Sequence, residues 1–299
     1  MIERFLSANG LRFRYLDWEG GGPDLILLHP TGFVADIWAP LAQRLRGRFH
    51  VVAPDCRGHG DTDKPAEYSM QLLVEDLRAL IDAAGLKTPV GIGHSAGATT
   101  ISALEAARPG TFRAAVLMEP VLNYRPNPNP LTTDTHSLAA SVLKRRAIWP
   151  SRASALDSYS SRPPFHDWNE TALREYVKHA FIDRPDGSVE LKCTPESESR
   201  MYLVGPQTVS ASGIIPRVRC PVLLIRGRDS PTLSQSTADR TAALLPDCRA
   251  VAIPGGHFAP FEQVQLTGDE ILRFLDEIEA VQPSEDSGPA ELSVSEGGS

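Results

Sequence analysis

The segment Gly93-His94-Ser95-Ala96-Gly97 places a serine between two glycines at the junction of two contrasting stretches. A short apolar run, 89–92, precedes it, and an Ala- and Leu-rich stretch without Gly or Pro, 98–107, follows it. A strand that stops where a helix starts forces the intervening residue into a tight turn, and the flanking glycines leave room for that turn. The pattern predicts a nucleophile elbow with Ser95 as the nucleophile. The alternative is a Gly/Ser-rich turn that only caps the helix, because G-x-S-x-G also occurs by chance.

Strand-like and helix-like stretches alternate around this segment. Two N-terminal stretches joined through Asn9-Gly10 predict a hairpin, and continuous apolar runs predict strands buried on both faces of a parallel sheet. The hairpin strands are expected at 3–7 and 11–18, the buried strands at 24–28, 49–53, 90–93, 113–118, 222–225 and 249–253, and the helices at 36–46, 69–84, 98–107, 233–245 and 261–280. This order predicts an α/β fold with a mostly parallel, doubly wound sheet.

The alternation is interrupted once, between residues 121 and 215. Helical patches at 133–147 and 168–182 and several aromatic residues, among them Trp149 and Trp168, predict a mainly helical cap that contacts substrate. The alternative for any one of these aromatics is a place in the small core of the cap itself. We therefore expect a core domain formed by 1–120 and 216–281, a cap formed by 121–215, and a disordered tail, 282–299, rich in Ser, Gly, Pro and Glu.

Composition excludes several function classes. The net charge of −7 includes four acidic residues in the tail, so the remainder is nearly balanced and indicates no nucleic-acid partner. The N-terminus lacks a secretory signal and no run of 18 uncharged apolar residues occurs, which predicts a cytoplasmic protein without a membrane span. The cysteines Cys56, Cys193, Cys220 and Cys248 are dispersed, so we expect free thiols and no metal site. No P-loop or dinucleotide-binding glycine pattern occurs, and we expect no cofactor.

Every candidate chemical group lies just after a predicted strand. These groups are the 29–32 loop, Asp55, Ser95, Glu119, Asp229 and His257. The carboxyl ends of parallel strands meet at one edge of a sheet, where ligands bind in folds of this class. Over about residues 3–280 the chain resembles the α/β-hydrolase superfamily. Three motifs carry the resemblance: the elbow, the segment 55–65, and Gly255-Gly256-His257-Phe258. The segment 55–65 is similar to the loop that follows the fourth strand in that superfamily.

The resemblance implies a serine hydrolase with a catalytic triad. A serine hydroxyl needs a base, and a histidine with an unperturbed pKa of about 6.5 suits that role. Of eight histidines, His257 occupies the superfamily's position for the base. We expect His94 to pack or to support the site, and His29 and His59 to hold loop conformation.

An oxyanion hole is implied by the same resemblance. The residue after the nucleophile, Ala96, supplies one N–H donor, and the loop after the third strand supplies the second from Thr31, or from Gly32 if the loop is shifted by one position. Pro30 replaces the usual glycine of that loop, but the donor is the residue after it.

The acid of the triad has two candidates. The superfamily's common position after the seventh strand is occupied by Ser230, with Asp229 one residue early. A subset that includes zearalenone lactonases places a Glu about 24 residues past the nucleophile, which matches Glu119. We favour Glu119 and keep Asp229 as the alternative acid.

These residues predict a serine hydrolase that cleaves a small, apolar carboxylic ester or lactone through an acyl-enzyme. An aspartate at the elbow would instead indicate a dehalogenase or an epoxide hydrolase. A carbon-carbon bond next to a ketone is a further possible target. The alternative from another class is a ligand-binding protein of the same fold that turns over slowly or not at all.

Overall fold

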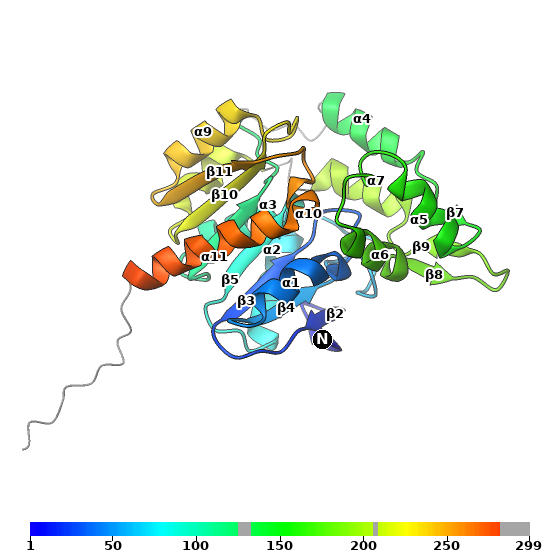
Figure 1. The fold of residues 1–299 in the computed structure, drawn as a ribbon, viewed down its shortest axis with the longest axis horizontal. Coiled ribbons are helices and arrows are strands. Elements are labelled where there is room, and N and C mark those ends of the chain that lie inside the picture. Colours follow the sequence, from blue (N-terminus) through cyan, green and yellow to red (C-terminus); the bar gives the residue numbers. More distant parts are fainter. Residues whose placement is uncertain (125–132, 206–208, 282–299) are drawn as a thin grey trace, which may run out of the picture.

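The structure is a computed structural model that describes residues 1–124, 133–205 and 209–281. The strands of its larger sheet are β1 (Ile2–Ala8), β2 (Leu11–Asp17), β3 (Asp24–Leu28), β4 (His50–Pro54), β5 (Val90–His94), β6 (Ala114–Met118), β10 (Val222–Gly227) and β11 (Cys248–Ile253). Their order in the sheet is β1-β2-β4-β3-β5-β6-β10-β11 (Figure 1). From β4 to β11 all neighbours are parallel, whereas β1, β2 and β4 pair antiparallel. The predicted mostly parallel sheet is confirmed.

Helices cover both faces of the sheet, which explains the continuous apolar runs of its strands. Their bounds are η1 (Ala35–Trp38), α1 (Ala39–Leu45), α2 (Met70–Ala83), α3 (Ala96–Ala107), α9 (Gln235–Leu244), α10 (Ala259–Glu262) and α11 (Val264–Val281). In β3, Leu25 and Leu27 belong to the core cluster that includes α1 and α11 residues, whereas Ile26 and Leu28 belong to the cluster that includes α2 and α3 residues. A strand with an apolar layer on each side needs an apolar residue at every position.

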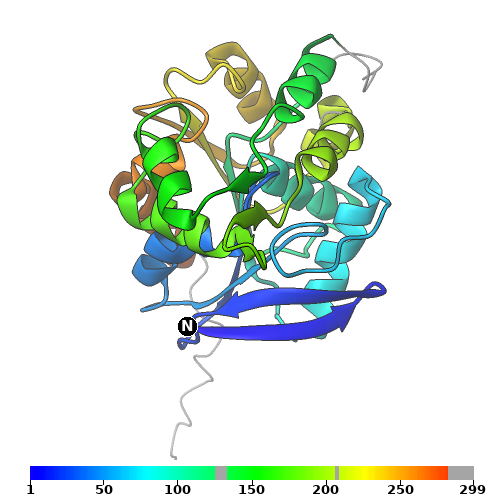
Figure 2. The same cartoon turned by 90° about the vertical axis from the view of Figure 1, so that its right-hand side faces the viewer.

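Most elements between β6 and β10 lie together as a separate group beside the sheet (Figures 1 and 2). They are α4 (Thr133–Val142), β7 (Ile148–Trp149), α5 (Arg152–Ser160), α6 (Glu170–His179), β8 (Phe181–Asp183), β9 (Val189–Leu191) and α7 (Pro195–Val204). The last two elements, α8 (Ala211–Ile214) and η3 (Ile215–Arg217), pack against α3 of the core instead. We call 133–204 the cap. The cap is mainly helical, as predicted, but it also contains a small antiparallel sheet in the order β7-β9-β8.

Local signals account for most element ends. Asn9 and Gly10 both have positive φ, 46° and 74°, as a two-residue turn between β1 and β2 requires. The Ser69 hydroxyl accepts the N–H of Leu72 and caps α2. The predicted helix 261–280 is divided at Gln263 into α10 and α11. The predicted tail, 282–299, lies outside the described residues.

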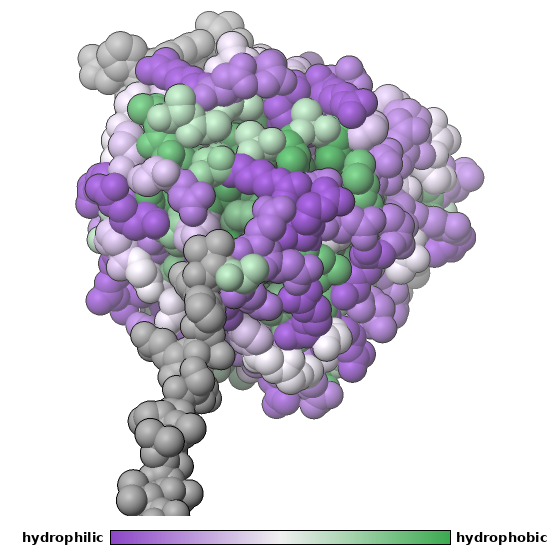
Figure 3. All heavy atoms as spheres, turned by 60° about the vertical axis from the view of Figure 1, so that its left-hand side comes forward, coloured by the Kyte–Doolittle hydropathy of each residue, from purple (hydrophilic) through white to green (hydrophobic). Residues whose placement is uncertain are grey.

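The surface carries both polar and apolar residues. On the face shown in Figure 3, an apolar area is bordered by polar residues. Within the described ranges, no helix has the length and apolar character needed to cross a membrane.

Candidate active site

Ser95 lies in the turn between β5 and α3 with φ 54° and ψ −116°. A positive φ is rare for a residue with a Cβ and is found where surrounding structure holds it in place. Two close approaches explain the flanking glycines: a Cβ on Gly97 would lie 2.3 Å from the Leu28 carbonyl oxygen, and one on Gly93 would lie 2.5 Å from the Ala98 nitrogen. The geometry is that of a sharp strand-to-helix elbow.

Glu119 follows β6, the strand beside β5, and also has a positive φ, 49°. Its side chain is fully buried and its carboxylate accepts three hydrogen bonds. The Gly227 N–H donates to Oε1 at 2.6 Å, and the Ser230 hydroxyl and His257 Nδ1 donate to Oε2 at 2.5 and 3.0 Å. A buried carboxylate with this many donors is held in one orientation.

His257 follows β11 and its side chain is 19% exposed. Because its Nδ1 donates to Glu119, the neutral ring carries its proton on Nδ1 and keeps the Nε2 lone pair available. The Ser95 N–H donates to the Met118 carbonyl at 2.9 Å, so the elbow lies directly beside the start of the Glu119 turn. In the described structure no hydrogen bond joins Ser95 Oγ to His257. Such bonds are often long before substrate binds.

Asp229, the alternative acid, occupies a different environment. It is exposed, and its side chain makes no hydrogen bond or ion pair with any described residue. The neighbouring Ser230 is buried and donates to Glu119 instead. Sequence reasoning noted Ser230 at the usual acid position but missed its role as a donor to the other carboxylate.

His94 connects the elbow to His257. It is fully buried, its Nε2–H donates to the His257 carbonyl at 2.8 Å, and the two ring centroids are 4.8 Å apart. Burial, with a smaller contribution from His257, holds the pKa of His94 well below its usual value. A neutral His94 agrees with the expected supporting role, and its bond to the His257 backbone was not predicted.

The loop after β3 carries the predicted oxyanion donors. The Gly32 N–H donates to His59 Nε2 at 2.9 Å and is therefore already used. Ala96 is the first residue of α3, where N–H groups have no acceptor within the helix. The N–H groups of Thr31 and Ala96 form no hydrogen bond with other described residues. The geometry thus disfavours Gly32 and leaves Thr31 and Ala96 as candidates.

His29 and His59 support this loop, in agreement with the expectation. His59 Nδ1–H donates to the Arg57 carbonyl, and His29 Nδ1–H donates to the Pro30 carbonyl while its Nε2 accepts the Cys56 N–H. Burial, and then the neighbouring His29, lower the pKa of His59 to about 3. Both rings serve as neutral bridges between backbone segments.

Trp149 and Trp168 have different surroundings. The Trp168 ring packs at 5.3 Å on Phe33 and on Phe258, the residue after His257, and at 4.9 Å on Phe261, so it joins the cap to the core. The Trp149 ring packs at 5.5 Å on Tyr159, and its indole N–H donates to the Arg146 carbonyl. Trp149 therefore belongs to the packing of the cap itself.

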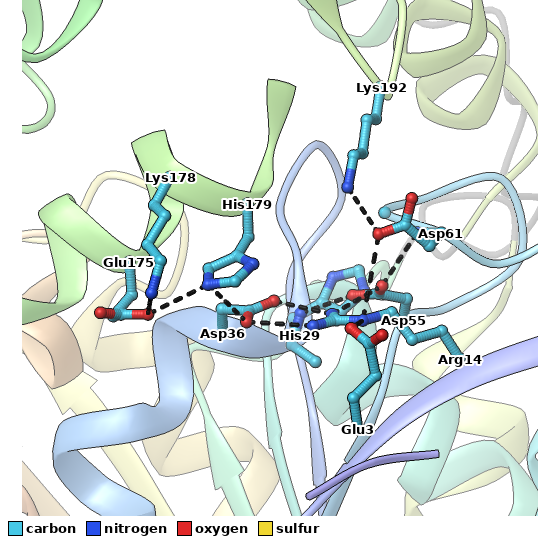
Figure 4. A network of polar contacts seen from close by, with 12 residues as sticks. Glu3, Arg14, His29, Asp36, Asp55, Asp61, Glu175, Lys178, His179 and Lys192 are labelled. Carbon is cyan, nitrogen blue, oxygen red and sulfur yellow. Dashed lines mark hydrogen bonds and ion pairs between the residues drawn. The ribbon is translucent and has the colours of Figure 1, made fainter. Parts of the chain in front are cut away.

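One group of potential metal ligands lies elsewhere, between α6 and η1. Ligand atoms of Asp36, Glu175 and His179 lie within 4.8 Å of one another (Figure 4). Both carboxylate oxygens of Asp36 already accept hydrogen bonds from the buried Arg14 guanidinium, at 2.7 and 3.2 Å. His179 Nε2 lies 3.4 Å from Asp36 and 3.3 Å from Glu175. This group is better described as an ion-pair network that joins cap to core.

A family model described as "Alpha/beta hydrolase family" matches residues 25–267. The chain belongs to the alpha/beta hydrolase family. Among its relatives are 2-(acetamidomethylene)succinate hydrolase of Mesorhizobium japonicum, 25% identical with 86% of this chain and 90% of the relative covered, and 2-hydroxy-6-oxo-6-(2'-aminophenyl)hexa-2,4-dienoic acid hydrolase of Metapseudomonas resinovorans, 25% identical with 92% and 91% covered. These relatives are hydrolases, which supports an enzyme.

Solved structures show the same fold as this alpha/beta hydrolase. The crystal structure of E-2-(acetamidomethylene)succinate hydrolase matches with a TM-score of 0.78 and 24% identity over 92% of this chain and 99% of that one. The thioesterase domain from the curacin biosynthetic pathway matches with a TM-score of 0.76 and 20% identity over 91% and 99%.

Proposed function

We propose that this protein is a serine hydrolase that cleaves a small carboxylic ester or lactone through an acyl-enzyme. The observation that carries the proposal is the hydrogen bond from His257 Nδ1 to the buried Glu119 carboxylate, beside the strained elbow that holds Ser95. A nucleophile, a base with a free nitrogen and a fixed acid are the parts that acyl transfer to water requires. Asp229 is left out of the proposed triad because it is exposed and does not contact His257.

In the proposed reaction, Ser95 Oγ attacks the carbonyl carbon while His257 Nε2 takes the hydroxyl proton. Glu119 stabilises the imidazolium that forms, and the N–H groups of Thr31 and Ala96 donate to the oxyanion. The intermediate collapses when the carbon-oxygen bond to the alcohol breaks and His257 protonates the departing oxygen. A water molecule then attacks the acyl-enzyme in the same way and releases the acid.

A carbon-carbon hydrolase is the second candidate. The relative from Metapseudomonas resinovorans acts on an acid whose name contains a ketone and no ester. The same three side chains could activate water to attack a ketone carbonyl. The carbon-carbon bond next to that carbonyl would then break, and the departing carbon, in place of an alcohol oxygen, would take the proton from His257.

Turnover of a substrate panel tests the proposal. The panel contains acyl esters, lactones of several ring sizes and one unsaturated keto acid of the second class, each offered to wild type and Ser95→Ala. We expect ester or lactone turnover and a loss of kcat of at least about 10⁴-fold in the variant. Ser102→Ala is the matched control, because this buried α3 serine donates only to its own helix, at the Ala98 carbonyl. Exclusive turnover of the keto acid would select the second candidate, and tight binding without turnover would indicate a ligand-binding protein.

A further inference from the structure

A hollow of about 40 Å³ lies against both proposed oxyanion donors, Thr31 and Ala96. It is bounded by the end of β3, the loop after β4, the inner faces of α2 and α3, and α7 of the cap. Its apolar lining includes Leu28, Pro30, Leu73, Leu77, Leu80 and Met201. Neither Ser95 nor His257 lines it.

The charged and imidazole groups that border the hollow are bonded to the protein itself. The buried Arg57 and Asp76 form a two-bond ion pair, with distances of 2.6 and 2.8 Å. The rings of His29 and His59 each bond two backbone groups. A charged or strongly polar occupant would lose its hydration there without gaining these groups as partners, so the hollow suits an apolar chain.

The position of the hollow decides which half of an ester it can take. His257 protonates the leaving alcohol in the proposed mechanism, so the alcohol lies on the His257 side. The carbonyl oxygen of the acyl half is held by Thr31 and Ala96 in both steps, and these two residues line the hollow. The acyl half therefore lies next to the hollow, whereas the alcohol lies away from it.

We infer that this hollow is the acyl-chain pocket and that the enzyme selects a short, unbranched apolar acyl group of about butyryl size. An apolar cavity of about 150 Å³ holds a benzene molecule. A hollow of about 40 Å³ is much smaller and therefore suits a chain of only a few carbons. The inference rests on the proposed function and specifies its substrate class.

Two series of esters test it. The first varies the acyl chain from acetyl to octanoyl on a constant p-nitrophenol, and the second varies the alcohol on a constant acetyl group. Wild type should show its highest kcat/KM at butyryl. Met201→Ala should raise kcat/KM for the octanoyl ester relative to the butyryl ester by about tenfold or more. Leu73→Phe should lower kcat/KM for the butyryl ester relative to the acetyl ester by a similar factor. Both variants should leave the alcohol series unchanged.

Matched controls come from neighbouring residues that do not line the hollow. Met70→Ala removes the same side chain from a buried α2 position, and Leu72→Phe adds the same ring one residue away from Leu73. Both should keep the wild-type acyl profile.

The outcomes separate the inference from the proposed function. Three outcomes would overturn the acyl pocket while ester hydrolysis stands. They are a wild-type optimum at octanoyl, an acyl profile that is unchanged in folded Met201→Ala or Leu73→Phe, and a change in the alcohol series instead of the acyl series. A wild type that turns over no ester and reacts with no serine-directed fluorophosphonate would overturn the proposed function, and the acyl pocket with it.

Discussion

Replacing Glu119 with Gln should disable the proposed base without removing any side-chain volume. The amide can point either way at this site. If its NH₂ group occupies the Oε2 position, it donates toward His257 Nδ1, which must then accept, and the proton moves to Nε2 where the base needs a lone pair. If the amide oxygen occupies that position, the NH₂ group faces the Gly227 N–H, donor against donor, at a site where the present distance is 2.6 Å.

Either arrangement costs a large part of the catalytic rate. Loss of the corresponding carboxylate in a Ser-His-Asp triad lowers kcat by about 10⁴-fold, which is equivalent to about 5.4 kcal/mol. We expect Glu119→Gln to lower kcat by about this factor while KM changes little. The kcat of Asp229→Asn should stay within about threefold of wild type, because substitutions at exposed positions usually have small effects. Steady-state kinetics on the best ester measures both. Circular dichroism checks that Glu119→Gln is folded, since an unsatisfied buried donor costs about 1–3 kcal/mol. A crippled Asp229→Asn beside a nearly normal Glu119→Gln would refute the reasoning.

Three further predictions follow from the same contacts. Ser230→Ala removes the 2.5 Å donor to Glu119 and should lower kcat by about tenfold with the fold retained, because a hydrogen bond to a charged group contributes about 1.5–3 kcal/mol. An unchanged kcat at saturating substrate would show that this hydrogen bond does not contribute to catalysis. Trp168→Ala should change selectivity among esters, whereas Trp149→Ala should mainly lower Tm, through a loss of about 3–5 kcal/mol; equal loss on every substrate in Trp168→Ala would assign it to packing alone. The pKa of His59 is about 3 in the folded protein, below its unfolded value, so below about pH 6.5 the unfolded state binds one more proton than the folded state. Each unit by which the pH falls below about 6.5 should therefore lower the free energy of unfolding by about 1.4 kcal/mol. Denaturant unfolding at pH 7.5 and pH 5 should therefore show a smaller pH dependence in His59→Gln than in wild type, and equal slopes would contradict this.

The sheet and the elbow could be predicted from the sequence because both depend on local patterns. Each central strand is a short apolar run, since both faces of the sheet are covered. The turn at Asn9-Gly10 and the cap at Ser69 follow from backbone and hydroxyl chemistry within a few residues. The strands β7, β8 and β9 were missed because two or three residues are too few to show an alternating pattern.

The site could be predicted only in part. Ser95 and His257 occupy marked positions, but the choice between Glu119 and Asp229 depends on which carboxylate meets a histidine 138 residues away from Glu119. The bond from Ser230 to Glu119 spans 111 residues and leaves no local signal beyond the displaced acid position. Trp149 and Trp168 look alike in the sequence, and only the tertiary packing separates a residue of the cap interior from one that contacts Phe258.

Covalent labelling of Ser95 tests the central claim most directly. A fluorophosphonate reacts with a serine that an adjacent base has activated, and peptide mapping by mass spectrometry locates the adduct. The proposed mechanism predicts one adduct, on Ser95, in wild type and in the Ser102→Ala control, and none in Ser95→Ala. Labelling that persists in Ser95→Ala, or a folded and ester-cleaving wild type that is not labelled at Ser95, would contradict it.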